Sequence, residues 1–363
     1  MPDNFGDRML FAAKAEGTYG QDAFSGSDPS SWLAMIEQES PPFSDEVERK
    51  QAGVMSLTHD VRRFDHYGDR IEVEGLTLPL KTATTAVDDP PPDEALYQAA
   101  NLKTAKRDPD SSAASGDEYW EAFPYTGDGM TNVPSATLAL YLFNSDYTKH
   151  AKWLAKGYRG NLTWTFVDGE IATLGLADGL ALYEKQPTPT TSSSLQPSAY
   201  SANERNFILK NGTFKYNSTT YPVAGFELST NWSVNRDDDG TQSTGTLAKV
   251  SLNRRSDAPP AGSFTLKARD GAVKDLIDDI DSGNPRKASL QLPNEGGGGE
   301  IYIELPRIQI DKEALALGGD PTFEVPFYCL GTWDSGGGTQ LTAGNNSFFI
   351  QHGDSSSDFG NRA

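Results

Sequence analysis

Residues 156–184 read KGYRGNLTWTFVDGEIATLGLADGLALYE, and this stretch decides the fold class. From residue 161 to residue 167, apolar side chains alternate with mainly polar ones, which is the period of a half-buried β-strand. The Asp-Gly pair at residues 168–169 is a tight-turn signal, and a second apolar strand follows until Gly179. The stretch therefore predicts a β-hairpin with one apolar face and one polar face.

Strand patterns also occupy most of the chain on both sides of this hairpin. Residues 223–234 show the cleanest alternation, residues 136–143 (ATLALYLF) are apolar on both faces, and Gly75 marks a bulge where the apolar positions change parity. Two amphipathic segments, residues 93–105 and 272–280, predict one short helix in each half. We therefore expect a mainly β protein with one short α-helix in each of two similar units.

The length of 363 residues suits two domains that each bury a core. A Pro-, Thr- and Ser-rich run at residues 186–202 interrupts the hydrophobic pattern, as linkers do. Both halves follow one plan of long hairpin, short helix and closing strands, although they share little residue identity, which suggests a structural duplication. We place a first domain at residues 1–190 with an N-terminal arm and loop at 1–45, a linker at 191–203, a second domain at 204–352 and a flexible C-terminal tail at 353–363.

The formal net charge of −20 argues against a surface that grips phosphates, because nucleic-acid binding depends on Lys and Arg. It is compatible with a conduit around DNA, since a polyanion passes more easily through a wall that does not attract it. An acidic surface that only maintains solubility explains the charge equally well. The first residues contain no apolar stretch of signal-peptide length, and we expect a soluble protein made in a cytoplasm.

The chain contains no complete sequence motif for catalysis, cofactor binding or metal binding. The chain has no Gly-x-Ser-x-Gly, His-Glu-x-x-His or Gly-Lys-Ser/Thr sequence. Residues 235–240 begin like a calcium loop, but Thr246 stands where a bidentate glutamate is needed. His59 and His66 lie in a charged turn that does not favour a metal site, and the single cysteine, Cys329, is expected to be a small buried hydrophobe. We therefore predict no enzyme, cofactor or metal site.

Three short motifs occur in a fixed order across residues 13–183. They are AKAEGTYG at residues 13–20, ALYQAA at residues 95–100 and KGYRG at residues 156–160, followed by the hairpin. Together they resemble the opening segment, the short helix and the closing hairpin of the major tail tube proteins of long-tailed (siphovirus-type) bacteriophages. Beyond residue 200 the resemblance is one of pattern only.

This resemblance implies a specific architecture and role. The fold would be two tandem tail-tube-type β-sandwich or half-barrel domains, and a two-domain chain implies trimeric rings of pseudo-sixfold symmetry. Stacked rings would form a virion tail tube, made in the host bacterial cytoplasm, that conducts double-stranded DNA during ejection without binding it tightly. The implied partners are further copies, a tape measure protein, a tail terminator and baseplate proteins, with no membrane. Related baseplate ring proteins share the domain and are not separated from a tube subunit by these motifs.

The polar faces of the predicted strands supply the candidate channel residues. For each of them, an ordinary solvent-exposed sheet is the alternative. The candidates are Glu227, Ser229, Asn231, Ser233, Asn235, Asn161, Thr163 and Thr165, followed by Glu72 and Glu74.

Two charged segments, residues 59–69 and 237–245, are predicted to be hairpin tips that contact the next ring. The candidate residues for ring stacking are His59, Arg62, Arg63, Asp65, Asp237, Asp238 and Asp239. Their charge predicts stacking that depends on salt.

The alternative from a different class is a two-domain β-sandwich that binds carbohydrate or acts as an adhesin. Such a module has a similar Gly-, Ser-, Thr-, Asn- and aromatic-rich composition, but it is expected to have a secretion signal and a concave aromatic platform. A glycan-cleaving enzyme is a third interpretation, which rests only on unassigned carboxylates among the 51 acidic residues. The size in solution separates rings and tubes from a monomeric binder.

Overall fold

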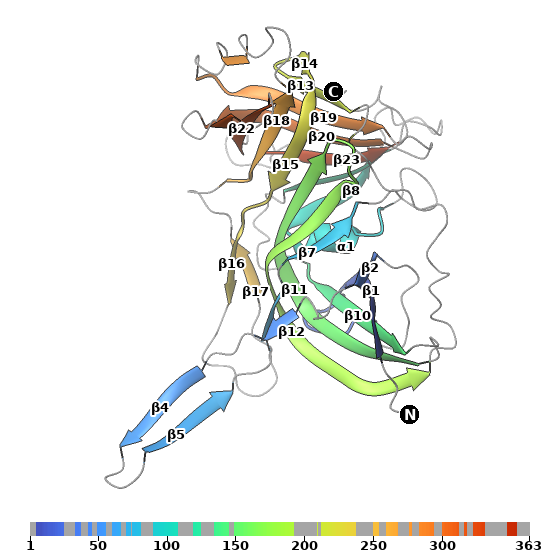
Figure 1. The fold of residues 1–363 in the computed structure, drawn as a ribbon, viewed down its shortest axis with the longest axis vertical. Helices are drawn as coiled ribbons and strands as arrows, with labels where there is room; N and C mark the ends of the chain where they lie inside the picture. The colour runs from blue at the N-terminus through green and yellow to red at the C-terminus, as the bar shows by residue number, and fades with distance from the viewer. Residues whose placement is uncertain are drawn as a thin grey trace.

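The computed structural model describes a mainly β protein (Figure 1). All pairs between its named strands are antiparallel, and they form one large sheet and two separate two-stranded hairpins. The described residues are 5–24, 33–37, 43–45, 49–55, 60–66, 70–73, 75–80, 90–107, 119–124, 134–144, 149–191, 209, 212–236, 250–253, 259–267, 276–277, 283–293, 300–311, 316–317, 322–330 and 347–353.

The first half of the chain contains twelve of the named strands and one helix. In chain order these are β1 (Phe5–Ala15), β2 (Ala34–Glu37), β3 (Phe43–Asp45), β4 (Arg49–Met55), β5 (Asp60–His66), β6 (Arg70–Val73), β7 (Leu76–Pro79), α1 (Glu94–Ala99), β8 (Leu102–Arg107), β9 (Tyr119–Pro124), β10 (Ala136–Asn144), β11 (Lys149–Val167) and β12 (Thr173–Thr191).

The second half contains the remaining eleven named strands. They are β13 (Thr213–Tyr216), β14 (Thr219–Tyr221), β15 (Val223–Ser229), β16 (Ser233–Arg236), β17 (Val250–Asn253), β18 (Ala261–Lys267), β19 (Arg286–Pro293), β20 (Glu300–Ile310), β21 (Ala316–Leu317), β22 (Thr322–Cys329) and β23 (Phe349–Gly353).

The β11–β12 hairpin confirms the prediction from residues 156–184. Leu162, Trp164 and Phe166 are all buried on one face, and the turn closes with a 3.0 Å hydrogen bond from the Glu170 N–H to the Val167 carbonyl. The predicted end at Gly179 is wrong, because β12 continues to residue 191 through the Pro- and Thr-rich run.

That extension of β12 pairs with the beginning of β11. Thr190 lies opposite His150, and Gln186 lies opposite Lys152. Pro187 and Pro189 occupy alternate positions, so their missing N–H groups point to the same side of the strand. Tertiary pairing has therefore overridden the local linker signal.

The predicted hairpin tip at residues 59–69 is wrong in position. Residues 60–66 form β5, which pairs along its length with β4. Arg62, Arg63 and Asp65 therefore lie along a strand. The hairpin projects from the body at the lower left of Figure 1.

The first predicted helix is shorter than its amphipathic pattern. Helix α1 covers only residues 94–99, and Asn101 has a φ of 59°, the left-handed conformation that ends helices. The chain then enters β8, so Lys103 is an exposed strand residue and not part of the buried helix face. In the predicted second helix, the described residues 276 and 277 are helical.

Other expectations are confirmed locally. Gly75 has a φ of +68° and separates β6 from β7, which explains the change of parity there. Described residues 136–141 of β10 are all buried. Cys329 is buried, and burial raises the pKa of its thiol, so it behaves as the small hydrophobe that was predicted.

The two halves of the chain are joined by strand pairing and by a shared core. Strand β11 pairs with β15, and β9 pairs with β23. Between these pairs lies α1, where the Tyr97 and Trp120 rings are 5.2 Å apart and the Trp164 Nε1–H donates to the Tyr97 hydroxyl at 3.2 Å. Phe348 packs 5.9 Å from the Trp164 ring. The core therefore runs across the boundary between the halves.

Candidate functional site

Six neighbouring strands form a continuous sheet region that passes from the first half into the second. Their spatial order is β7, β12, β11, β15, β18 and β22. The change of half occurs at the β11–β15 pair, where Thr163 lies opposite Ser229 and Thr165 lies opposite Glu227. We call the two sides of this six-stranded region the apolar face and the polar face.

The apolar face is packed into the core along every strand. Aromatic rings dominate its centre, with the Phe166 and Phe226 centroids 6.0 Å apart and the Phe264 and Phe327 centroids 6.0 Å apart. Its buried members are Leu76, Leu78, Leu174, Leu176, Leu162, Trp164, Phe166, Phe226, Leu228, Phe264, Leu266, Phe323, Val325 and Phe327. Since this side is filled, the opposite side is the one that is open to solvent.

The polar face consists mostly of small side chains, and none of its described members is buried. Because directly opposed residues of antiparallel strands share a face, the register defines its rows. The rows are Thr77, Gly175, Thr163, Ser229, Ala261 and Tyr328; then Pro79, Thr173, Thr165, Glu227, Ser263 and Pro326; then Val167, Gly225, Thr265 and Glu324.

Charge on these rows is sparse and comes only from the second half. Glu227 and Glu324 are exposed carboxylates, separated by β18 and its hydroxyl residues. At the end of β18, Lys267 forms an ion pair with Asp168 in the β11–β12 turn. The face is therefore mildly acidic, and its nearest lysine is already paired with a carboxylate.

Four of the predicted channel residues lie together on the polar face. Thr163, Thr165, Glu227 and Ser229 form two adjacent cross-strand pairs at the centre of the region. The Thr163 Oγ1 hydroxyl donates to Ser229 Oγ at 3.3 Å across the two halves. The alternation in the sequence therefore predicted the side of the strands on which these four residues lie.

Asn161 has the parity of the polar-face residues but is buried, so the prediction of a solvent-facing side chain there is wrong. It is 2% exposed, and its Oδ1 accepts from the Trp232 N–H at 2.6 Å and from the Thr230 hydroxyl at 2.8 Å. Its Nδ2 donates to the Trp232 carbonyl at 2.9 Å. The amide thus links β11 to the segment that follows β15 through buried hydrogen bonds.

The other predicted channel residues lie beyond the six-stranded region. The run from residue 227 to residue 235 is interrupted, because Asn231 has a φ of 53° and its amide donates to the Pro259 carbonyl. Ser233 and Asn235 belong to the separate β16–β17 hairpin, so the prediction that they continue the β15 face is wrong. Glu72 is half-buried on β6, opposite Leu180, and Glu74 lies outside the described residues.

The ring-stacking candidates are described only in part. Arg62, Arg63 and Asp65 lie on β5, for which the backbone is described. His59, Asp237, Asp238 and Asp239 lie outside the described residues.

A polar cluster around Glu16 was not identified as a unit from the sequence. The carboxylate accepts hydrogen bonds from the Gly20 N–H at 2.7 Å and the Gly157 N–H at 2.6 Å. The hydroxyls of Ser135 and Thr137 lie 2.6 and 2.8 Å from its oxygens. One side chain therefore joins the N-terminal loop to β10 and β11.

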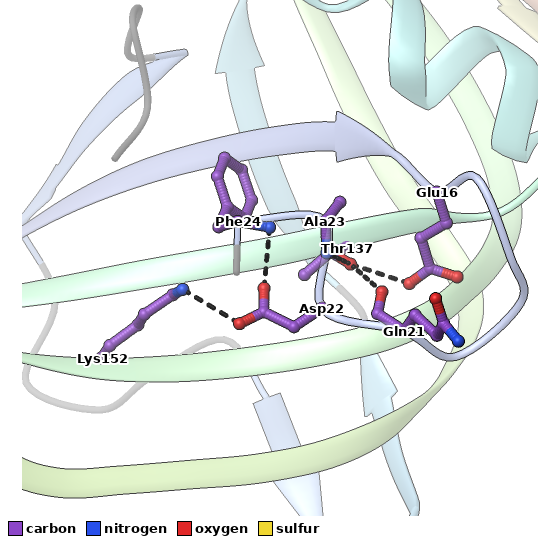
Figure 2. Close-up of polar contacts among 7 residues, drawn as sticks. All are labelled: Glu16, Gln21, Asp22, Ala23, Phe24, Thr137 and Lys152. Carbon is purple, nitrogen blue, oxygen red and sulfur yellow. Dashed lines mark hydrogen bonds and ion pairs between the residues drawn. The ribbon is translucent and has the colours of Figure 1, made fainter. Parts of the chain in front are cut away.

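Residues 21–24 continue this attachment (Figure 2). Thr137 Oγ1 accepts from the Ala23 N–H at 3.1 Å, and the Asp22 carboxylate accepts from the Phe24 N–H at 2.8 Å. Lys152 on β11 lies 3.3 Å from the second Asp22 oxygen. The loop is thus held across β10 and β11 by several directed contacts.

Two of the sequence motifs meet in this cluster, although about 140 residues separate them. The Arg159 guanidinium carbon lies 4.9 Å from the centroid of the Tyr19 ring. Gly157 has a φ of +64°, and a Cβ there would lie 2.8 Å from the same ring. Burial lowers the pKa of Arg159, opposed by the nearby Tyr19 and Glu16. The motifs at residues 13–20 and 156–160 are therefore two sides of one contact.

No known protein-family model matches the chain, and no curated protein matches it. Among the residues that the structure describes, no group of three or more His, Cys, Asp or Glu side chains is arranged to hold a metal ion. In the same described ranges, no helix combines the length and apolar character needed to span a membrane.

Proposed function

We propose that the chain is a structural subunit of a bacteriophage tail tube, in which rings of this protein stack around a channel for double-stranded DNA. The observation that carries the proposal is the polar face, because it runs without interruption from β7 in the first half to β22 in the second. In the proposed tube this face lines the channel, and the apolar face packs against the outer layers.

The chemistry of the polar face suits passage better than binding. Proteins that hold nucleic acid present Lys and Arg to the phosphates, and the release of counterions drives the association. Here the rows present hydroxyls, glycine and two carboxylates, and Lys267 is paired with Asp168. DNA moving along such a wall would meet few strong attachments.

The edges of the region support association into a ring. Within the described residues, β7 pairs on one side only, with β12, and β21 pairs only with β22. An open edge exposes backbone N–H and C=O groups that a second chain can satisfy. Joining these edges between copies would close the sheet into a barrel, which has no edges. The proposed assembly is a trimeric ring of pseudo-sixfold symmetry, with one unit from each half.

The contact between the motifs adds support from a different part of the molecule. Residues 13–20 and 156–160 carry the resemblance to tail tube proteins, and they meet around Glu16, Tyr19 and Arg159. Short motifs that coincide by chance have no reason to share one packed cluster. The proposed partners are accordingly those of a tail: the tape measure protein, the tail terminator and baseplate proteins, within the virion.

The projecting β4–β5 hairpin is a proposed contact between rings. Its strands contain four basic residues and two acidic ones, against a net charge of −20 for the whole chain. A basic arm would be attracted to the acidic body of a neighbouring copy. Since exposed charges are screened over about 8 Å at physiological ionic strength, stacking should weaken as salt increases.

The decisive experiment is negative-stain microscopy with light scattering on the purified full-length chain. Rings or tubes with a central hole support the proposal. A monomer at all concentrations and salt conditions would contradict it. The carbohydrate-binding alternative predicts such a monomer, together with retention on a glycan array, and the described polar face offers it one exposed aromatic residue, Tyr328.

A further inference from the structure

Two exposed apolar side chains flank the turn at one end of the polar face. Among the described residues, the exposed large hydrophobics are Val167, Ile171, Ile277 and Tyr328. Val167 is 40% exposed and Ile171 is 46% exposed, and they flank the β11–β12 turn. Glu170, between them, is also exposed. An apolar pair held in water without cover is a candidate contact surface.

The turn that carries this pair is held in one conformation by the second half of the chain. The Asp168 N–H donates to the Ala224 carbonyl at 2.9 Å, and the Gly169 N–H donates to the Leu209 carbonyl at 3.0 Å. Gly169 has a φ of +78°, and Asp168 pairs with Lys267. An exposed turn that is already ordered loses little conformational entropy when it binds.

The opposite end of the same face carries a complementary set of groups. Tyr328 is 40% exposed, and its hydroxyl donates to Asp311 at 3.3 Å. It lies opposite Gln309 on β20, and the exposed Arg307 lies two residues earlier on that strand. The rows of Val167 and Tyr328 are four residues apart along the strands, about 13 Å at the usual rise. One end thus presents an apolar pair beside the exposed carboxylate of Glu170, and the other presents Tyr328 with the Arg307 guanidinium and the Asp311 carboxylate near it.

We propose that these ends contact each other between copies of this chain, with the turn at residues 167–171 of one copy docked against Tyr328 and Arg307 of the next. The contact rests on the proposed stacking of rings and assigns residues to it. Val167 and Ile171 cover the tyrosine ring, and Glu170 faces the guanidinium of Arg307. Because the two surfaces differ, the contact is heterologous and propagates as an open stack.

Charge selects this arrangement over a two-fold contact between identical turns. A turn-to-turn dimer would bring two Glu170 carboxylates together, and like charges at an interface oppose association. The head-to-tail arrangement instead gives Glu170 an opposite charge. A second copy of this chain is therefore the occupant that the distribution of charge favours.

The first test introduces charge at the apolar pair. The Val167→Asp, Ile171→Asp double variant should form normal rings but raise the protein concentration needed for tube growth by roughly tenfold or more, as expected when an apolar contact is replaced by buried charge. Ile277→Asp changes an equally exposed residue outside the polar face and should polymerise like the original chain. Tubes of unchanged length from the double variant would overturn the inference and leave the tube proposal standing.

The second test identifies the contacting surface of the next copy by disulfide cross-linking. A chain with Ile171→Cys and Tyr328→Cys should give, under mild oxidation, a ladder of disulfide-linked species that extends beyond one ring. The native Cys329 is buried with a raised pKa, so it does not compete. Dimers from Ile171→Cys alone would indicate a two-fold contact and overturn the head-to-tail inference. Absence of rings in the unmodified chain would instead overturn the proposed function, and the contact with it.

Discussion

The junction between the two halves and the attachment of the N-terminal loop are built around a single polar side chain each, but in different surroundings. Asn161 is 2% exposed at the junction and bonds to Thr230 and Trp232. Glu16 binds the loop through two N–H groups and two hydroxyls in a partly buried setting. The junction is enclosed by aromatic core, whereas the loop cluster borders solvent.

This difference predicts how each region fails. Water can replace a lost partner near the surface, but a buried group that loses its partner keeps the full cost of desolvation. Changes at the junction should therefore unfold the whole chain, since β11–β15 and β9–β23 bind the halves into one core. Changes at the loop cluster should release the loop locally and leave the sheet intact.

The largest effect is expected from Asn161→Leu. Leucine fills similar space but leaves the Trp232 N–H and carbonyl and the Thr230 hydroxyl without this partner, and we expect a loss of about 4 kcal/mol in the free energy of unfolding. Urea denaturation followed by tryptophan fluorescence measures it. Asn235→Leu, at an exposed position of β16, is the control and should change stability by less than about 0.5 kcal/mol. Equal effects of the two variants would contradict the junction role of Asn161.

Gly262→Ala tests the close approach of β18 to β15 beside the junction. A Cβ at Gly262 would overlap the backbone oxygen of Glu227, which cannot move without disturbing the strand pair. We expect a loss of about 3 kcal/mol, typical of overpacking. Gly175→Ala is the matched control, because its Cβ would lie 3.6 Å from the nearest atom, the Thr163 carbonyl oxygen. Similar melting temperatures for the two variants would show that the strand pair adjusts freely.

The junction should also be sensitive to acid through His352. This residue is buried on β23 with its ring 5.2 Å from that of Trp120, and burial lowers the pKa of the imidazole from 6.5 to about 3. Below pH 6.5 the unfolded chain binds a proton that the folded chain does not. The free energy of unfolding therefore decreases as the pH is lowered from 6.5 toward 3. The loss should be about 2 kcal/mol between pH 6.5 and pH 5.

The control for this pH effect is His352→Phe, which removes the titrating group and keeps a ring beside Trp120. Its free energy of unfolding should change less between pH 6.5 and pH 5, a range in which most carboxylates stay ionised. Parallel pH profiles for the variant and the original chain would assign the acid sensitivity to other groups.

The sequence alone predicts the strands whose faces differ in polarity, but not the partners of those strands. Thr163, Thr165, Glu227 and Ser229 lie on the less buried side of their strands, as the alternation predicted, because period-two alternation reports facing directly. Asn161 has the same parity but is buried, because Trp232 and Thr230, about 70 residues later in the chain, pack against it and hydrogen-bond to its side chain. No local sequence pattern encodes this contact. For the same reason, the pairing of β11 with β15 was not predicted.

Long-range pairing also explains the errors in the boundaries. Residues 186–191 have a linker composition and became strand because β11 extends beside them. The charged residues of β5 suggested a turn, but they form a strand because they pair with β4. The cluster around Glu16 contains residues from two motifs, at residues 13–20 and 156–160. Only their contact in the structure shows that together they attach the N-terminal loop.

The smallest global effect is expected from Glu16→Gln, which tests whether the loop is attached locally. In either orientation the new amide NH2 meets a backbone N–H, that of Gly20 or that of Gly157, so at least one donor loses its acceptor. The global free energy of unfolding should fall by only about 1 kcal/mol, because solvent replaces part of the loss. Hydrogen exchange at residues 17–24 should accelerate while exchange in β11 stays slow. Glu170→Gln, at an exposed turn, is the control. Faster exchange throughout β10 and β11 would mean that the loop cluster supports the whole sheet, and the contrast with the Asn161 junction would disappear.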